Sequence, residues 1–148
     1  MLDKNTEILE YASQVLLDEA EAVNKIRTFL NDDFVESVKT ILRSNGRLII
    51  TGIGKSAIIG QKIVATLNST GTPAIFMHAA DAIHGDLGMV QPGDVVVCIS
   101  KSGNTPEIKV LIPLVKNFGN KLIAIVGNLD SFLAKEADIV LNTTVEHE

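Results

Sequence analysis

Five short, unbroken apolar runs constrain most strongly what this chain can fold into. They occupy residues 48–51, 74–77, 94–99, 122–127 and 139–141. Between them, apolar residues recur at helical spacing in residues 58–67, 107–115 and 131–137. Buried strands that alternate with helices are typical of a parallel sheet covered on both faces, joined by right-handed crossovers. The sequence therefore predicts an α/β fold, a three-layer α/β/α sandwich around a five-stranded parallel sheet.

Two helices are predicted before the first strand. Apolar residues recur every three or four positions over residues 5–30, which would make one helix about 39 Å long. We expect part of so long a helix to pack on another subunit. Asp32 or Asp33 then caps a second helix, and Gly46 fits the left-handed position after it. We expect one domain over residues 1–148, with helices in 5–44 and the α/β core in 46–141.

The charge balance excludes one class of partner. Thirteen Lys and Arg face eighteen Asp and Glu, for a formal net charge of −5. Non-specific binding to nucleic acid needs a basic surface, so we expect no nucleic-acid partner. A small anion needs only one local positive site and is still possible.

Hydropathy and cysteine usage exclude further classes of protein. No apolar run approaches the roughly 20 residues of a membrane span, and the acidic N-terminal segment does not resemble a signal peptide. We therefore expect a cytoplasmic protein with no membrane partner. Its apolar surplus predicts a homo-oligomer, a dimer or tetramer. The single cysteine, Cys98, excludes a disulfide framework and a Cys-rich zinc site, and its apolar run predicts burial.

Ligands of such sheets bind outside the carboxyl ends of the strands, so the loops there are the first candidates for a site. The first, residues 52–56, is no nucleotide P-loop, because Ile49 stands where that motif needs glycine. A loose dinucleotide pattern ends at Ala57, but His78 stands near where its acidic residue is expected. The glycines could serve a tight turn alone. Alternatively, Gly54, Lys55 and Ser56 contribute to an anion site at a helix N-terminus.

The third loop, residues 100–107, carries the strongest signal. Ser100, Ser102 and Thr105 supply three hydroxyls around Gly103, and Pro106 suits the first turn of a helix. Hydroxyls, backbone N–H groups and a positive helix end together favour a phosphate dianion. The alternative is an ordinary N-cap by Thr105 with two serines in a turn. We assign no role to Lys101 and Asn104.

The middle loop, residues 78–89, holds two of the three histidines. His78 and His84 lie there with Asp81 and Asp86, but their spacing matches no standard metal site. We predict no metal or organic cofactor. A general acid or base role for His84 is one interpretation, and a histidine hydrogen-bonded in a surface loop is the other.

These loops together resemble a known family. The Ser-x-Ser-Gly-x-Thr loop at residues 100–105 is similar to that of the sugar isomerase (SIS) domain. The combination of residues 52–56, 69–73 and 84–89 resembles its arabinose 5-phosphate isomerase branch, which supplies the Kdo pathway of lipopolysaccharide and capsule synthesis. The likeness covers about residues 35–148.

The resemblance implies a flavodoxin-like strand order and a set of active-site residues. Ser100, Ser102 and Thr105 would bind the sugar phosphate. Lys55, Glu107 and Glu148 would lie in the active site, and His84 at its mouth, often reached from a neighbouring subunit. Proteins of this family usually continue beyond the position that corresponds to Glu148, with another helix, a second histidine and often CBS domains. We therefore expect either a fragment of a longer protein or a short stand-alone form.

The implied reaction interconverts D-ribulose 5-phosphate and D-arabinose 5-phosphate through an enediolate. Glu107 or Glu148 would be the base, Lys55 the electrostatic stabiliser and His84 the group that opens the sugar ring or protonates oxygen. The alternative is a non-catalytic SIS module that senses a phosphosugar or sugar nucleotide. A third hypothesis is a nicotinamide-dependent dehydrogenase, which would have to bind NAD.

Overall fold

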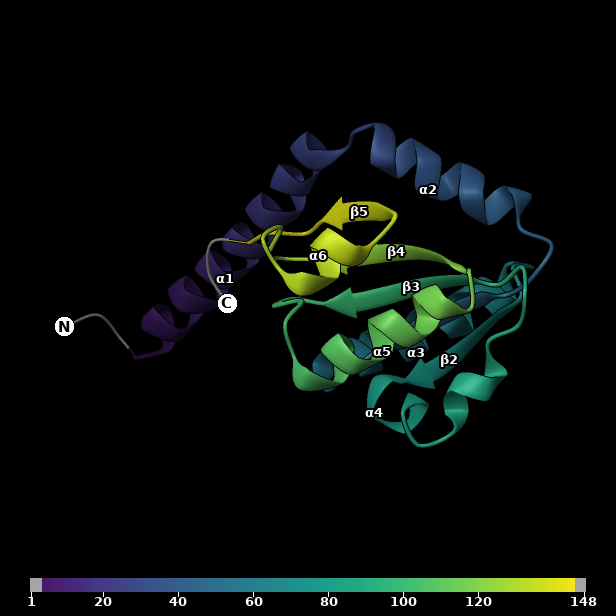
Figure 1. Cartoon of the computed structure of the whole chain (residues 1–148). Helices are drawn as coiled ribbons and strands as arrows, with labels where there is room; N and C mark the ends of the chain where they lie inside the picture. The colour runs from purple at the N-terminus through teal and green to yellow at the C-terminus, as the bar shows by residue number, and fades with distance from the viewer. Residues whose placement is uncertain (1–3, 146–148) are drawn as a thin grey trace.

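The computed structural model describes residues 4–145 and contains one five-stranded sheet. Its strands are all parallel, in the order β2-β1-β3-β4-β5 (Figure 1). The predicted α/β class and the flavodoxin-like order are confirmed. The elements are α1 (Lys4–Ile26), α2 (Asp32–Arg43), β1 (Leu48–Gly52), α3 (Lys55–Ser69), β2 (Ala74–His78), α4 (Ala79–Ala82), β3 (Val95–Ser100), α5 (Pro106–Asn117), β4 (Lys121–Val126), α6 (Phe132–Glu136) and β5 (Ile139–Asn142), with 3₁₀ helices η1 (Arg27–Phe29) and η2 (Asp86–Met89).

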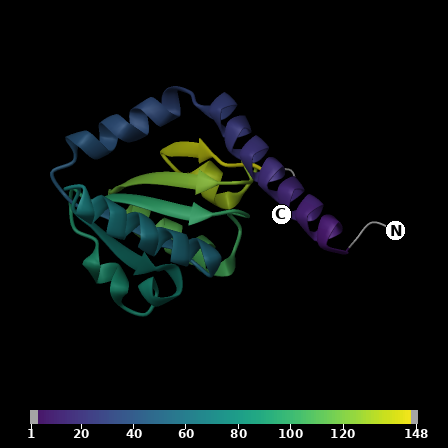
Figure 2. The same ribbon diagram turned by 180° about the vertical axis from the view of Figure 1, so that it is seen from behind.

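Each face of the sheet has its own core, because successive side chains of a strand point to opposite faces. Ile49 and Val96 pack among α4, α5 and α6, whereas Ile50 and Val97 pack against α2 and α3. Figure 2 shows α3 lying across the sheet on the side opposite to α5. This double burial explains the unbroken apolar runs of the sequence.

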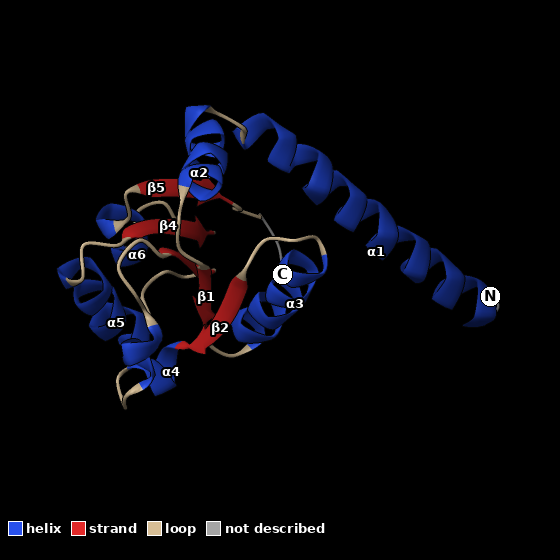
Figure 3. Ribbon diagram, turned by 90° about the vertical axis from the view of Figure 1, so that its right-hand side faces the viewer, coloured by secondary structure: helices blue, strands red, loops and turns tan. Residues whose placement is uncertain are grey.

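The first helix is shorter than predicted and lies apart from the core. It ends at Ile26 and is followed by η1, so the predicted single helix over 5–30 is wrong at its C-terminal end. None of its residues is buried, and Figure 3 shows it extending away from the sheet. Large apolar side chains such as Leu9 and Leu16 are 70% and 67% exposed. The described residues contain no helix long and apolar enough to span a membrane.

Two local predictions around α2 are corrected. The N-cap is Asn31, not Asp32 or Asp33, since its side chain accepts hydrogen bonds from the N–H groups of Asp33 and Phe34. Gly46 is not in the left-handed region. A methyl group there would lie 2.5 Å from the carbonyl carbon of Gly93, so close backbone approach, not a positive φ, requires the glycine.

The parallel strands all begin at one end of the sheet, which we call the amino edge, and end at the other, the carboxyl edge. A buried carboxylate, that of Asp94, connects the loops at the amino edge. Asp94 accepts hydrogen bonds from the backbone N–H groups of Arg47 (2.7 Å) and Gln91 (2.9 Å), and from the Arg47 guanidinium (3.0 Å). Asn120 donates from its side chain to the carbonyls of Gln91 and Asp94. These bonds join the loop before β3 to the starts of β1 and β4.

Two further expectations concern the middle of the chain. The loop over residues 78–89 contains short helices, α4 and η2, because Ala79 and Ala82 pack into the core. Cys98 is fully buried as predicted, and burial raises the pKa of its thiol to about 12. A thiol in that state is not a nucleophile at neutral pH.

Candidate functional site

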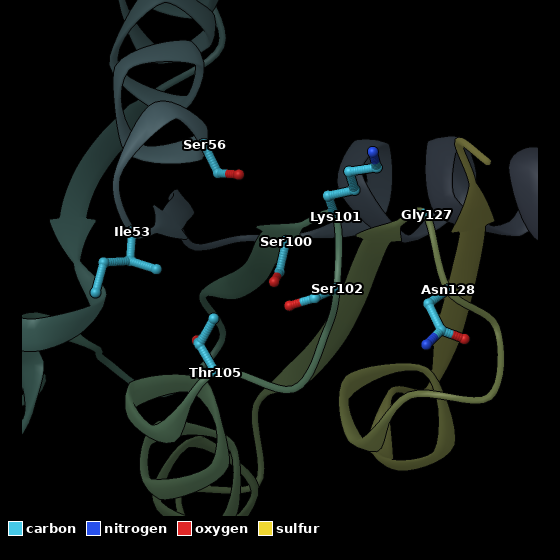
Figure 4. A pocket seen from close by; sticks show the side chains of 8 residues that line it. All are labelled: Ile53, Ser56, Ser100, Lys101, Ser102, Thr105, Gly127 and Asn128. Carbon is cyan, nitrogen blue, oxygen red and sulfur yellow. The ribbon is translucent and has the colours of Figure 1, made fainter. Parts of the chain in front are cut away.

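A cleft of about 480 Å³ opens at the carboxyl edge of the sheet, where three neighbouring strands end. Its lining comes from the loops after β1, β3 and β4: Ile53, Ser56, Ser100, Lys101, Ser102, Thr105, Gly127 and Asn128 (Figure 4). Because β1 continues to β2 on one side and β3 to β4 on the other, this is the topological switch point of the sheet. Ligands of open α/β sheets bind at such points.

The loop after β3, residues 100–105, presents hydroxyl donors to this cleft. The Ser100 hydroxyl oxygen accepts a hydrogen bond from the Gly103 N–H (3.0 Å), and that of Ser102 accepts one from the Asn104 N–H (3.4 Å). A hydroxyl that accepts still has its own hydrogen to donate. Figure 4 shows both hydroxyls pointing into the same space. The loop is thus prepared to donate to an anion.

The contacts of Thr105 contradict one of the two interpretations of this loop, the ordinary N-cap. Its side chain accepts no hydrogen bond from the first turn of α5, so it is not an ordinary N-cap. Its Oγ1 is buried and has no hydrogen-bond partner among the described residues. A buried hydroxyl without a partner is costly. A ligand oxygen in the cleft would satisfy it and would also meet the positive end of α5.

Glycine is required at one position in this loop. Gly103 has φ +63°, and an added methyl group would collide with the side chain of Ser131, whose Cβ would be 2.6 Å away. The Gly103 carbonyl accepts from the N–H of Leu133 (3.0 Å). Gly103 thus brings the loop against the start of α6.

The loop after β4 is one of the loops that the strand pattern indicates, but the sequence assigned no role to its residues. Gly127 and Asn128 line the cleft, and the Gly127 N–H donates to the Lys101 carbonyl (3.1 Å). Their position after a buried strand indicated the loop, and no recognisable motif singled out the two residues. Lys101, assigned no role from the sequence, is the one charged side chain among the described residues that line the cleft. No described carboxylate lines it, which suits a dianion.

The glycine loop after β1 contributes one hydroxyl to the cleft. Ser56 lines it and is half-buried, while Gly54 has φ +58° and precedes the first residue of α3. Lys55 is that first residue and is exposed, outside the cleft lining. The loop therefore forms a tight turn and also places Ser56 in the cleft lining, with Lys55 before it in the chain.

Of the other predicted catalytic residues, Glu107 and His84 do not line the cleft. Glu107 is half-buried in the first turn of α5, two residues after Thr105. His84 is exposed between α4 and η2, in the connection that follows the edge strand β2. Glu148 lies outside the described residues.

In the middle loop, His78 lies near Asp81. His78 Nδ1 lies 3.8 Å from the Asp81 carboxylate, a distance too long for a hydrogen bond. Residues 4–145 contain no group of three or more His, Cys, Asp or Glu side chains that could hold a metal ion.

Comparison with known proteins decides the family. The sequence model of the SIS domain family matches residues 41–148 of this chain. The chain belongs to the SIS domain family. It is 49% identical to a Haemophilus influenzae protein named "Probable arabinose 5-phosphate isomerase", over 100% of the chain and 44% of that protein. It is 42% identical to arabinose 5-phosphate isomerase KdsD of Pseudomonas aeruginosa, over 99% of the chain and 45% of that protein.

The fold of this SIS domain is shared with a solved structure of a ligand complex. The c3406 protein of E. coli CFT073, solved in complex with arabinose 5-phosphate, superposes with a TM-score of 0.93 at 37% identity, covering 99% of this chain and 78% of that one. The chain spans less than half the length of the two curated relatives, 44% and 45%. The SIS fold and family are therefore established for residues that include the whole cleft.

Proposed function

We propose that the chain is the SIS domain of a phosphosugar isomerase that interconverts D-ribulose 5-phosphate and D-arabinose 5-phosphate. The observation that carries this proposal is the Thr105 Oγ1, which is buried and without a partner among the described residues, on a residue that lines the same cleft as Ser100 and Ser102. A phosphate oxygen supplies the acceptors that these groups lack. The names of the relatives, and the sugar-phosphate complex of the c3406 protein, support a pentose phosphate as the ligand.

In this proposal, phosphate binding positions the carbon atoms that react. Ser56, Ser100, Ser102 and Thr105 donate hydrogen bonds to the phosphate, supported by the positive end of α5. Gly54 and Gly103 allow the two loops to approach it. Anchoring the distant phosphate holds C1 and C2 of the sugar at one place, so binding energy contributes to the chemical step.

The chemistry then needs a base, an electrophile and help with ring opening. A carboxylate, Glu107 or Glu148, removes a proton from C1 of the ketose and returns it to C2, while a proton moves from the C1 oxygen to the C2 oxygen. Lys55 stabilises the negative enediolate oxygen. His84 opens the cyclic form of the aldose. No step in this scheme uses a metal ion or an organic cofactor.

A second candidate is supported by a specific observation. Lys55, His84 and Glu107 lie outside the described lining of the cleft. The three hydroxyl residues of the loop over residues 100–105, which we call the phosphate loop, lie inside it. An SIS module that binds a phosphosugar without converting it would need only the second group. The two candidates thus share a ligand and differ in chemistry.

An isomerase assay combined with a binding measurement separates these candidates. The chain is mixed with ribulose 5-phosphate, the formation of arabinose 5-phosphate is followed, and binding of each sugar is measured by calorimetry. Turnover supports the isomerase, and binding without turnover supports the sensing module. Absence of both binding and turnover contradicts both.

We also propose that the chain forms a homo-oligomer in the cytoplasm through α1. An amphipathic helix of 23 residues with no buried residue gains little stability by itself, because most helical stability in proteins comes from packing of an apolar face. A second copy offers the same exposed apolar face. Sedimentation of the wild type and of Leu16→Asp tests this, since a monomeric wild type would contradict it.

A further inference from the structure

The side chain of Asn104 connects the phosphate loop to α6. Its Nδ2 donates to the Ser102 carbonyl (3.2 Å), and its Oδ1 accepts from the backbone N–H of Phe132, the first residue of α6 (3.0 Å). Its own N–H donates to the Ser102 hydroxyl (3.4 Å). The Asn104 side chain therefore joins the backbone of Ser102 to the start of α6, while the bond to the Ser102 hydroxyl comes from the backbone N–H, which any non-proline residue at position 104 would keep.

The start of α6 is joined to the same loop by two further contacts. The Leu133 N–H donates to the Gly103 carbonyl (3.0 Å), and Gly103 packs against the fully buried Ser131. The Ser131 hydroxyl accepts from the Ala134 N–H (3.2 Å). The first N–H groups of a helix have no partner within the helix. In α6 two of them are satisfied by the phosphate loop, so the helix and the loop form one hydrogen-bonded unit.

Without the connection through Asn104, Ser102 would be the least constrained of the three hydroxyl residues in the loop. It is exposed, whereas Ser100 is buried and Thr105 is half-buried. An exposed loop serine has several rotamers and a mobile backbone, and ordering both on ligand binding costs free energy. The bonds from Asn104 set the position of Ser102 before a ligand arrives.

We propose that Asn104 is a positioning residue of the phosphate site, which orients Ser102 toward the ligand by fixing it to α6. This inference rests on the proposed binding of a sugar phosphate. Asn104 is not among the residues that line the cleft, so it acts through Ser102 and not by touching the substrate.

A double-mutant cycle on the binding of arabinose 5-phosphate tests whether Asn104 acts through Ser102. The variants are Asn104→Ala, Ser102→Ala and the double variant, with affinities measured by calorimetry. Asn104→Ala lowers the affinity of the wild type about fivefold, the effect of a single lost hydrogen bond. In the Ser102→Ala background the same change costs about twofold or less, because the hydroxyl that it positions is already gone.

Asn68→Ala is the matched control. The side chain of Asn68 also makes one donated and one accepted bond, to the carbonyl and the N–H of Ala74 (both 2.9 Å), on the connection between α3 and β2. This variant lowers thermal stability but leaves affinity unchanged. The phosphorus NMR resonance of bound arabinose 5-phosphate shifts in Asn104→Ala and does not shift in Asn68→Ala.

The two proposals fail in different ways. A wild type that binds no arabinose 5-phosphate overturns the proposed function, and this inference with it. Equal affinities of wild type and Asn104→Ala, or the same loss in both backgrounds, overturn the inference alone. If Asn104→Ala does not fold, Asn104→Asp replaces it in the cycle, since its carboxylate still accepts from Phe132. The repulsion that its charge adds acts with or without the Ser102 hydroxyl, so the cycle still isolates the coupling.

Discussion

The two edges of the sheet use their polar groups in opposite ways. At the amino edge, Asp94 accepts three hydrogen bonds and the Asn120 amide donates two. At the carboxyl edge, the hydroxyls of Ser100 and Ser102 still have a hydrogen to donate, and Thr105 Oγ1 has no partner among the described residues. The Asn120 Oδ1 at the amino edge is also buried without a partner among the described residues, but Asn120 does not line the cleft. The amino edge is therefore closed mostly by its own side chains, whereas the carboxyl edge is open to a ligand.

This contrast indicates which polar atoms of such a fold are candidates for ligand binding. Polar atoms that are already paired stabilise the chain, and replacing them lowers the free energy of unfolding. Polar atoms held in place without a partner cost stability and gain a partner only from outside. Variants at the two edges should therefore change different measured quantities: turnover and affinity at the carboxyl edge, and the free energy of unfolding at the amino edge.

The largest effect is expected on turnover at the carboxyl edge. Lys55→Ala and Glu107→Gln each lower isomerase turnover about a hundredfold or more, because electrostatic stabilisation and proton transfer are lost. Both variants keep the melting temperature of the wild type, since Lys55 is exposed and Glu107 makes no described hydrogen bond from its side chain. Lys62→Ala, a second exposed lysine of α3, is the control and retains full turnover. Full activity in both test variants would refute their assignment.

The second effect concerns the folding of the amino edge. Gly46→Ala places a methyl group 2.5 Å from the Gly93 backbone, and backbone cannot rotate away, so we expect a loss of about 3 kcal/mol or more in the free energy of unfolding. Gly88→Ala is the control, because its methyl group would meet no atom within 4 Å, and its loss should stay within about 0.5 kcal/mol. Urea denaturation measures both. Similar values for the two would show that the close approach does not limit stability.

The third effect is a dependence of stability on pH. Burial raises the pKa of Asp94, but hydrogen bonds from the Arg47 and Gln91 N–H groups and the Arg47 guanidinium outweigh it, and the pKa is lowered overall. A lowered pKa contributes stability above the unfolded pKa of about 3.9, which is lost as pH falls through the folded value. Asp94→Asn should cost about 2 kcal/mol at neutral pH, from lost charged hydrogen bonds.

Denaturation at several pH values checks this prediction. Below about pH 4, where aspartates protonate, the wild type should lose stability more steeply than Asp94→Asn. Some pH dependence persists in the variant, because the pKa of Asp138 is lowered in the same direction: burial raises it, but bonds from Leu122 and Lys121 outweigh burial. Equal slopes for the two proteins would contradict the role given to Asp94.

The smallest effect compares two buried threonines. Thr105→Val removes a buried oxygen without a described partner, so stability should stay equal or rise slightly, while affinity for arabinose 5-phosphate falls about tenfold. Thr51→Val is the control, because Thr51 Oγ1 is likewise buried without a described partner but does not line the cleft. Only the first variant should bind the phosphosugar more weakly. Equal affinities would mean that the Thr105 hydroxyl is no phosphate donor.

The strands were predictable because their signal is local. Each predicted run lies within about one residue of an observed strand, since a sheet buried on both faces requires apolar side chains at every position. The candidate loop over residues 100–105 was recognisable for a similar reason, as three hydroxyls and a glycine stand within six residues. Gly46 was misread, because the contact that requires glycine comes from Gly93, a distant part of the chain.

The α/β class, the five strands and a loop rich in hydroxyls could be predicted from the order of the residues. The contact between Asn104 and Phe132, the place of Gly127 and Asn128 in the cleft and the absence of buried residues in α1 became visible only in the fold. The two sets of features differ in how far apart in the chain the contacting residues stand. Burial patterns and turn chemistry are written in consecutive residues, whereas a cleft and its supports are made by loops that only the sheet brings together.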